Sequence, residues 1–294
     1  MINFSCKHNV LIKNPDGTYS RMDEPYFRAE EIAPNTWKIL SSGDHSYLLV
    51  GEEEGISVDT GYGAGNIREY LQTLTDKPVR NTINTHHHFD HSANNGYFEK
   101  AYMHPNAFDT ATIPYASFDG IEFSRDYTFV PIYHGDKYDL GNRELEFFYI
   151  PDHTPDGIAI LDRKERLLIV GDEFMPMGKV IKTTVSQFAA YTRELIKHRA
   201  AYDVVFAGSG KLPDNIIDSY YECLRQIIEE NAGVPYVPKS RKPFPEMKGP
   251  NGETVYDRIR PHPGDGGAGK ALPDGDWYCH SVNGFEVVFL NSKR

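Results

Sequence analysis

Histidine and aspartate side chains crowd into one short stretch of this sequence. His86, His88, Asp90 and His91 fall within six consecutive positions of "THHHFDH". Imidazole nitrogens and carboxylate oxygens are ligands that suit zinc, iron and manganese. A surface patch of histidines is the alternative interpretation, but the spacing H-x-H-x-D-H is too specific to favour it. The stretch predicts a metal site with room for two ions, one bound by His86 and His88 and one facing Asp90 and His91.

Two more candidate ligands lie further along the chain. His153 stands in the turn "PDHTPDG" and Asp172 closes the stretch "LLIVGDE", and each follows a predicted strand. Functional groups collect at the ends of strands in open sheets. Either residue alone would be a turn residue or a strand end, but together with the histidine cluster they indicate one metal centre. Asp152 and Asp156 add negative charge to the turn, which we expect to discourage strongly anionic substrates.

The elements that must position these side chains are strands with helices between them. Alternating or β-branched runs predict strands, and apolar residues at helical spacing predict helices. In the first half, the predicted strands cover 37–40, 46–50, 55–59 and 79–85, with a helix over 64–74. In the second half, strands are predicted over 143–150, twice within 157–172 and over 203–208, with helices over 185–202 and 213–233. This pattern favours sheets packed together with helices outside.

An aromatic-rich segment covers residues 105–138, directly after the histidine cluster. It forms either a lid over the site or an excursion whose rings pack on the body of the protein. Tyr133 and His134 within it are candidate substrate-binding residues.

The end of the sequence differs in composition from the rest. Residues 237–275 are rich in Pro and Gly, and a hairpin that turns at Asn283 and Gly284 follows them. We expect a catalytic domain over 1–235 that includes the aromatic excursion. We expect 236–294 to form an arm and a terminal hairpin packed on the same domain, with the arm either joining a homo-oligomer or staying a tail.

Charge and hydropathy restrict the partners of the chain. The net charge is −11 and the basic residues are scattered, which argues against binding to nucleic acid. No apolar run approaches the roughly 20 residues needed to cross a bilayer, and the first residues lack the apolar core of a signal peptide. We therefore expect a cytoplasmic protein that acts on a small molecule, with no nucleic acid or membrane partner.

The sequence resembles the metallo-β-lactamase superfamily. The matching segments are "SVDTGYG", "THHHFDH", "DHTPDG", "VGDE" and "VVFAGSG", in the order that the family has them. The resemblance implies an α+β fold, an αββα sandwich of two packed mixed β-sheets with helices outside. It also implies a metal site along one edge of the sheets.

Carried over position by position, the resemblance implies ligands for a first metal position at His86, His88 and His153. Asp172 resembles the residue that bridges the two ions. Asp59 resembles the carboxylate that holds the ligands in place without binding a metal itself.

The resemblance also implies a second metal position, bound by Asp90 and His91. Where the family usually reads G-H-G, this chain has Ser209 between two glycines, so the last imidazole of the second position is absent. A neutral hydroxyl is a poor ligand, and we expect weaker binding of the second ion. Three other histidines could replace the missing one: His45, His262 and His280.

The ligand types predict hydrolysis. A metal held by three neutral imidazoles lowers the pKa of bound water from about 15.7 to about 7, so that hydroxide forms at neutral pH. Asp90 would take a proton from the water and pass it to the leaving group. We expect zinc, as one or two ions, with iron or manganese as alternatives.

The expected substrate is a small ester, lactone or thioester. Three alternatives stay open: a mononuclear iron enzyme of the same fold that uses oxygen, a non-catalytic ligand-binding or sensing protein, and a β-lactam hydrolase. Fold alone does not decide among them, because the superfamily carries many reactions.

Overall fold

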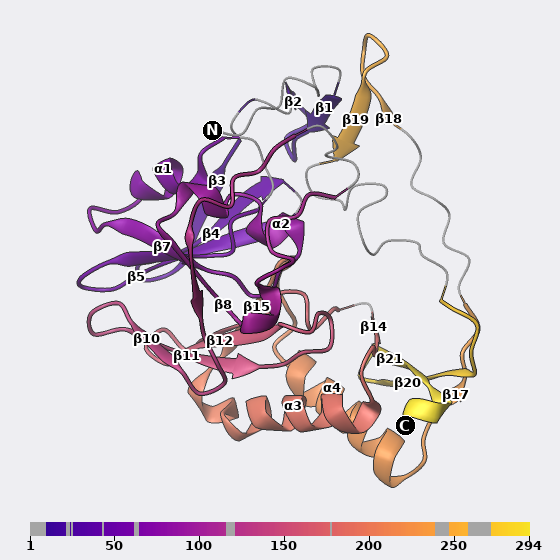
Figure 1. Cartoon of the computed structure of the whole chain (residues 1–294). Helices are drawn as coiled ribbons and strands as arrows, with labels where there is room; N and C mark the ends of the chain where they lie inside the picture. Colours follow the sequence, from indigo (N-terminus) through magenta and orange to yellow (C-terminus); the bar gives the residue numbers. More distant parts are fainter. Residues whose placement is uncertain are drawn as a thin grey trace. The chain divides into compact units, whose positions relative to one another are not determined.

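The computed structural model describes residues 10–21, 24, 26–42, 44–61, 65–115, 121–176, 178–238, 247–257 and 272–294. The chain divides into two compact units. Figure 1 labels most of the helices and strands. The first unit takes the described residues of 1–131, 139–143 and 241–270. The second takes those of 132–138, 144–240 and 271–294.

The first unit is built on a seven-stranded sheet in sequential order from β3 to β9. Its strands are β3 (Arg28–Ala33), β4 (Thr36–Ser42), β5 (Asp44–Val50), β6 (Gly55–Val58), β7 (Val79–Ile83), β8 (Lys100–Met103) and β9 (Thr128–Pro131). Neighbours from β3 to β6 are antiparallel, and neighbours from β6 to β9 are parallel. The parallel half brings the carboxyl ends of β6, β7 and β8 to one edge, which is where the histidine cluster follows β7.

A smaller sheet and two short helices complete the first unit. The sheet has the order β18-β19-β1-β2. Its strands are β1 (Val10–Lys13), β2 (Tyr19–Arg21), β18 (Met247–Lys248) and β19 (Thr254–Asp257). The helices are α1 (Ile67–Gln72) and α2 (Phe89–Ser92), with 3-10 turns at Asn95–Tyr97 and Pro105–Ala107. Because β19 pairs in parallel with β1, part of the predicted arm belongs to a sheet.

The second unit contains a six-stranded sheet with the order β10-β11-β12-β13-β15-β16. Its strands are β10 (Lys137–Asp139), β11 (Glu144–Tyr149), β12 (Ile158–Asp162), β13 (Leu167–Ile169), β15 (Val204–Ala207) and β16 (Gly210–Lys211). Every residue of β12 and β13 is buried, which explains why both read as continuous apolar runs.

A four-stranded sheet with the order β14-β21-β20-β17 closes the second unit. Its strands are β14 (Lys179–Val180), β17 (Val234–Pro235), β20 (Trp277–Val282) and β21 (Phe285–Leu290), and a 3-10 turn follows at Asn291–Lys293. The predicted terminal hairpin is confirmed, since β20 and β21 pair antiparallel across Asn283 and Gly284. Both turn residues have positive φ, 53° and 87°, the conformation that Asn-Gly adopts in two-residue hairpin turns.

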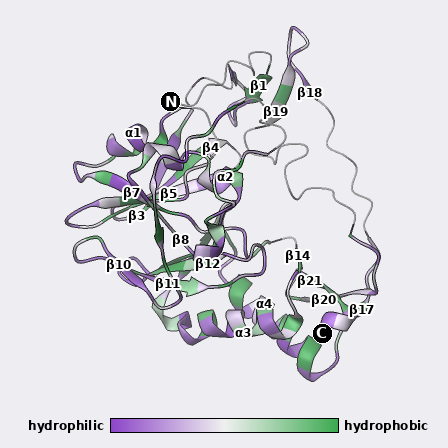
Figure 2. Cartoon of the chain, in the orientation of Figure 1, coloured by the Kyte–Doolittle hydropathy of each residue, from purple (hydrophilic) through white to green (hydrophobic). Residues whose placement is uncertain are grey.

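Two amphipathic helices pack in the second unit, α3 (Val185–Lys197) and α4 (Ile216–Glu229), and a 3-10 turn at Arg199–Ala201 follows α3. Figure 2 shows hydrophobic residues interleaved with hydrophilic ones along both helices. The buried side chains include Phe188 of α3 and Tyr220 of α4, which join one core with β-strand residues of the same unit. Neither these helices nor any other helix among the described residues is long and apolar enough to cross a membrane.

Two helices are shorter than the sequence predicts, and the residues at their ends explain the difference. The helix predicted over 64–74 begins only at Ile67, because the Asn66 side chain accepts a hydrogen bond from the Glu69 N–H. The helix predicted over 185–202 ends at Lys197 and continues as the short 3-10 turn. Its start at Val185 is fixed by a capping box between Thr184 and Gln187.

In the aromatic-rich segment, several of the described rings pack on other aromatic rings of the first unit. Phe123 meets Phe89 of α2 edge to face, with ring centroids 4.5 Å apart, and Phe108 meets Phe129 of β9 at 5.1 Å. These contacts favour the interpretation as a packed excursion. Phe118, also in the segment, lies outside the described residues.

Candidate metal centre

The loop after β7 carries four candidate ligands of the first unit. His86 and His88 lie on the loop, and Asp90 and His91 lie on α2 directly after it. Side chains tie this tight turn together, because the Ser92 hydroxyl lies within hydrogen-bonding distance of the carbonyl oxygens of two loop residues, at 3.0 and 3.1 Å. These tethers fix the spacing of the ligands.

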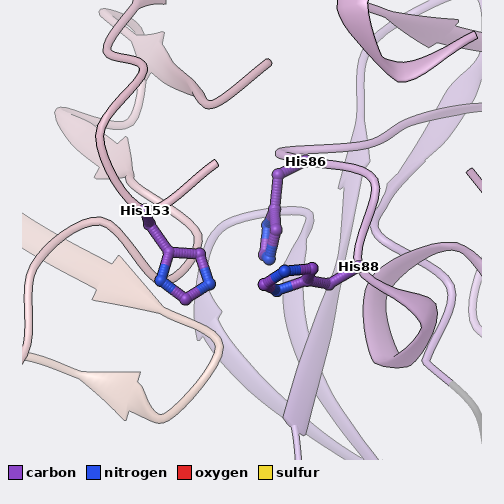
Figure 3. Close-up of side chains that lie close together, drawn as sticks. All are labelled: His86, His88 and His153. Carbon is purple, nitrogen blue, oxygen red and sulfur yellow. The ribbon is translucent and has the colours of Figure 1, made fainter. Parts of the chain in front are cut away.

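The imidazoles of this loop lie against one another. The ring centroids of His86 and His88 are 4.7 Å apart (Figure 3), and those of His86 and His91 are 4.1 Å apart. His86 and His91 are buried, with 2% and 0% of their surface exposed. Imidazole nitrogens gathered in this way are of the ligand type that zinc, iron and manganese accept.

Asp59, at the end of β6, sets the orientation of two of these rings. Its carboxylate accepts hydrogen bonds from the backbone N–H and the hydroxyl of Thr85, at 2.7 and 2.8 Å, and contacts Nδ1 of His91 at 2.8 Å. Because a carboxylate only accepts, Nδ1 of His91 must carry the proton. The Thr85 hydroxyl has given its hydrogen to Asp59, so Nδ1 of His86, 3.1 Å away, donates to Thr85. This network leaves Nε2 of both rings as the metal-binding nitrogen.

Asp59 adopts a backbone conformation that is rare for a residue with a side chain, with φ of 60°. Aspartate and asparagine tolerate this left-handed region better than most residues. The strained position aims the carboxylate at Thr85 and His91.

Asp90 is held by a tyrosine of the aromatic-rich segment. The Tyr115 hydroxyl donates to Oδ1 of Asp90 at 2.7 Å, and Oδ2 of Asp90 lies 3.9 Å from Nε2 of His91. The distance of 3.9 Å is too long for a hydrogen bond but short enough for two ligands of one ion, whose bonds are each about 2.0–2.2 Å. Sequence reasoning did not single out Tyr115, and no local motif marks it among its aromatic neighbours.

The second unit contributes His153 and Asp172. His153 lies in the loop between β11 and β12, and Asp172 follows β13. Nε2 of His153 and Oδ2 of Asp172 are 4.0 Å apart, and both side chains are 19% exposed. The two groups therefore form a pair at neighbouring strand ends of this unit.

The side chains of Asp152, Glu173 and Lys179 form a buried cluster next to His153. We call this cluster the acid–lysine triad. The ammonium of Lys179 is 2.9 Å from a carboxylate oxygen of each acid. Both oxygens of Glu173 accept from the backbone N–H of His153, at 3.1 and 2.9 Å. The triad thus holds the backbone that carries His153.

The pKa values of the two acids in the triad shift in opposite directions. Burial raises the pKa of Glu173, Lys179 lowers it and Asp152 raises it again, with a net rise to about 7. Burial also raises the pKa of Asp152, but Lys179 and Thr183 outweigh burial and the net pKa is lowered. Asp152 therefore does not present its charge to solvent. Its charge is paired with Lys179. The expectation that Asp152 and Asp156 discourage strongly anionic substrates stays a prediction.

The sequence profile of the metallo-β-lactamase superfamily matches residues 43–208, more than half of the chain. The chain belongs to this superfamily. The match contains all six of the ligand residues that the resemblance implied.

Two curated proteins that are similar to this chain illustrate its relatives. One is the bovine (Bos taurus) acyl-coenzyme A thioesterase MBLAC2, 27% identical over 169 residues, or 46% of this chain and 60% of the relative. The chain thus spans about 60% of the length of that relative. The other is the probable metallo-hydrolase MJ0888 of Methanocaldococcus jannaschii, 26% identical over 196 residues, or 60% of this chain and 92% of the relative.

Among solved structures, a metallo-β-lactamase with a HARLDQ motif from Cronobacter sakazakii superposes with a TM-score of 0.53 at 16% identity. The match covers 71% of this chain and 95% of the other. The predicted fold class is confirmed: the chain has the metallo-β-lactamase fold, of the α+β class, with several mixed sheets and few helices.

Three further predicted residues, Ser209, Tyr133 and His134, belong to the second unit. Ser209 is exposed between β15 and β16. Tyr133, 53% exposed, and His134 lie just before β10, where Nδ1 of His134 accepts from the Tyr149 N–H at 3.3 Å. Both are exposed residues of the second unit.

Of the three histidines considered as replacements for the missing ligand, His45 lies on β5 of the first unit. His280 lies on β20, where its Nε2 contacts Oε1 of Gln226 on α4 at 2.7 Å. His262 lies outside the described residues.

The donor set fits the metal centre of the superfamily. The groups of the centre are neutral imidazoles and carboxylates, which could hold a metal ion. The hydrogen bonds of Asp59 supply the orientation that such imidazole ligands need.

Proposed function

We propose that this chain is a metal-dependent hydrolase of small carboxylic thioesters, with esters and lactones as related substrates. The observation that carries the proposal is the hydrogen-bond network of the ligand loop. Asp59 and Thr85 occupy Nδ1 of the buried imidazoles, so that Nε2 is left as the nitrogen that can bind a metal. Zinc is the expected metal, and iron or manganese are alternatives.

The proposed ligands of the first position are His86, His88 and His153, which Figure 3 labels. Those of the second position would be Asp90 and His91, and Asp172 is a further proposed ligand of the centre. A metal ion bound by such ligands supplies a Lewis acid and lowers the pKa of water to about 7. The match of the superfamily profile to both units supports taking the ligands from both.

Asp90 is the proposed proton carrier. When the second position is empty, its Oδ2 would accept a proton from the attacking water, while Tyr115 steadies the carboxylate through Oδ1. The water oxygen forms a bond to the acyl carbon, and the bond from that carbon to sulfur breaks. Asp90 then delivers its proton to the departing thiolate, so that a carboxylic acid and a thiol are released.

Two observations favour thioesters among the acyl substrates. Relatives named acyl-coenzyme A thioesterase are 26–27% identical to this chain over 169 residues. The pairing of Asp152 with Lys179 also removes a charge that would oppose an anionic thioester such as an acyl-coenzyme A.

Thiol release from a panel of acyl-coenzyme A thioesters tests the proposal, with small esters, lactones and a β-lactam measured in parallel. We expect the highest kcat/KM for a thioester, and loss of turnover by at least about a hundredfold in His86→Ala. His87→Ala is the matched control, because His87 lies beside the ligands without being one, and we expect it to keep activity.

Three results would overturn the proposal. One is no turnover of any thioester by metal-replete protein. Another is equal activity in His86→Ala and His87→Ala. The third is iron in protein purified without added metal together with consumption of oxygen, which would favour the oxygen-using alternative.

A further inference from the structure

We infer that Asp44 is a ligand of the second metal position and takes the place of the imidazole that this chain lacks at Ser209. The inference rests on the metal centre proposed above. It concerns a residue that neither the spacing of the motifs nor the resemblance indicated.

Asp44 opens β5, next to α2 in the first unit. A carboxylate oxygen of Asp44, one of Asp90 and a ring nitrogen of His91 lie within 4.8 Å of one another. All three residues belong to the same unit, so their arrangement depends only on the fold of that unit. Asp44 is half-buried and His91 is fully buried, which places the three groups at a partly sheltered point.

The backbone of the β4–β5 hairpin explains how Asp44 reaches this point. The pairing of the two strands shifts by one residue between Leu40 and Ser42, and Ser42 pairs with Asp44 at the tip. A β-bulge of this kind increases the local twist and redirects side chains, and bulges are common beside active sites.

The chemistry of the three groups suits a divalent cation. Nε2 of His91 is the metal-binding nitrogen, because Nδ1 donates to Asp59. Two carboxylates within 4.8 Å repel each other unless a cation or a proton lies between them. A divalent ion bound by Asp44, Asp90 and His91 would offset both negative charges.

Replacing an imidazole by a carboxylate also changes the selectivity of the position. Two carboxylates and one imidazole form a harder ligand set than one carboxylate and two imidazoles. The second position should therefore favour manganese or iron more strongly than the usual second position of the superfamily does. This follows from the ligand types alone.

Titration of metal-free protein with manganese tests the inference, with free Mn²⁺ followed by electron paramagnetic resonance. We expect two equivalents to bind to the wild type. In Asp44→Asn the second equivalent should bind about tenfold more weakly or worse, while the first keeps its affinity. Asp76→Asn is the matched control, because Asp76 is an exposed aspartate of the same unit and the change in charge is identical.

Asp44→Glu tests whether weaker binding in Asp44→Asn comes from the missing carboxylate or from a damaged fold. It keeps the carboxylate, so we expect it to retain the second ion with an affinity closer to that of the wild type than Asp44→Asn shows. Circular dichroism of each variant verifies that the unit is folded.

The outcomes separate this inference from the proposed function. If the wild type binds no metal at all, the proposed metal centre fails and the role of Asp44 fails with it. If the wild type binds only one ion at millimolar manganese, or if Asp44→Asn binds the second ion as tightly as Asp76→Asn does, the role of Asp44 alone is overturned.

Discussion

In the acid–lysine triad of the second unit, two buried carboxylates meet a lysine, whereas Asp59 and Asp90 of the first unit meet hydroxyl, amide and imidazole groups. In the acid–lysine triad, Lys179 lies 2.9 Å from both Asp152 and Glu173. Among the described residues, Asp59 and Asp90 have no lysine or arginine at such a distance; their partners are Thr85, His91 and Tyr115.

This difference separates a structural cluster from a ligand cluster. A buried carboxylate needs a partner for its charge, and an internal lysine supplies one without any bound ion. Where the partners are oriented imidazoles instead, the group is suited to a cation from solution. The acid–lysine triad therefore stabilises the His153 loop, and the ligand loop is prepared for metal.

The largest expected effect comes from removing the cation of the triad. Lys179→Met leaves two carboxylates buried without their partner, and we expect the free energy of unfolding to fall by about 3–5 kcal/mol. Denaturation by urea measures this change. Lys197→Met removes an exposed lysine paired with Glu194 and should cost less than about 1 kcal/mol. Equal losses in the two variants would contradict the structural role of Lys179.

Asp59→Asn tests the cluster of candidate ligands in the first unit. Asparagine tolerates the positive φ of this position but cannot accept all three hydrogen bonds, so His91 loses its fixed orientation. We expect metal affinity to fall by about 10- to 100-fold in competition with a chelator. Asp162→Asn is the control, because Asp162 is a buried aspartate that accepts backbone N–H groups in the β12–β13 turn. If it weakens metal binding as much, orientation by Asp59 is not the cause.

The pH dependence of stability should show the shifted Glu173. Its pKa rises from the ordinary 4.5 to about 7, so between these values the folded protein holds a proton that the unfolded chain has released. The free energy of unfolding should therefore decrease as pH rises through this window. For Asp152, whose pKa is lowered, the contribution is present above its ordinary 3.8 and is lost as pH falls below that value.

Glu173→Gln isolates the first of these two effects. Measured in excess chelator, so that metal binding does not contribute, this variant should lose the decline of stability between pH 4.5 and 7. Glu99→Gln replaces an exposed glutamate and should keep it. A decline that persists unchanged in Glu173→Gln would have to come from another group.

The smallest expected effect is that of Thr85→Val. The hydroxyl relays the influence of Asp59 to His86, and its loss should weaken metal binding a few-fold, or about 0.5–1.5 kcal/mol. Thr82→Val removes a similar buried hydroxyl from β7, one that donates to the carbonyl oxygen of Ser57. We expect metal affinity to be unchanged there, and an equal effect of the two variants would argue against the relay.

The sequence predicted the features that depend on local spacing. The positions of His86, His88 and His91 are six residues or fewer apart, and the strand before them is a clear alternating run. The terminal hairpin was equally visible, because Asn283 and Gly284 suit only a narrow set of turns. These signals do not require knowledge of distant contacts.

Features that depend on distant contacts could not be predicted in this way. Tyr115 lies 25 residues from Asp90, and Asp44 is separated from the histidine loop by two strands and a helix. The sequence also does not reveal that Asp152 pairs with Lys179, and it indicates only that Asp152 adds negative charge to its turn. In each case the side chain is ordinary and only its position in the fold gives it a role.

The central claim is that the ligand loop of the first unit binds metal. Anomalous diffraction at the zinc absorption edge, from crystals grown with zinc, tests it most directly. The account predicts a strong peak about 2.0–2.2 Å from Nε2 of His86 and from the ring of His88. Crystals with ample zinc and no anomalous peak beside these two imidazoles would contradict it.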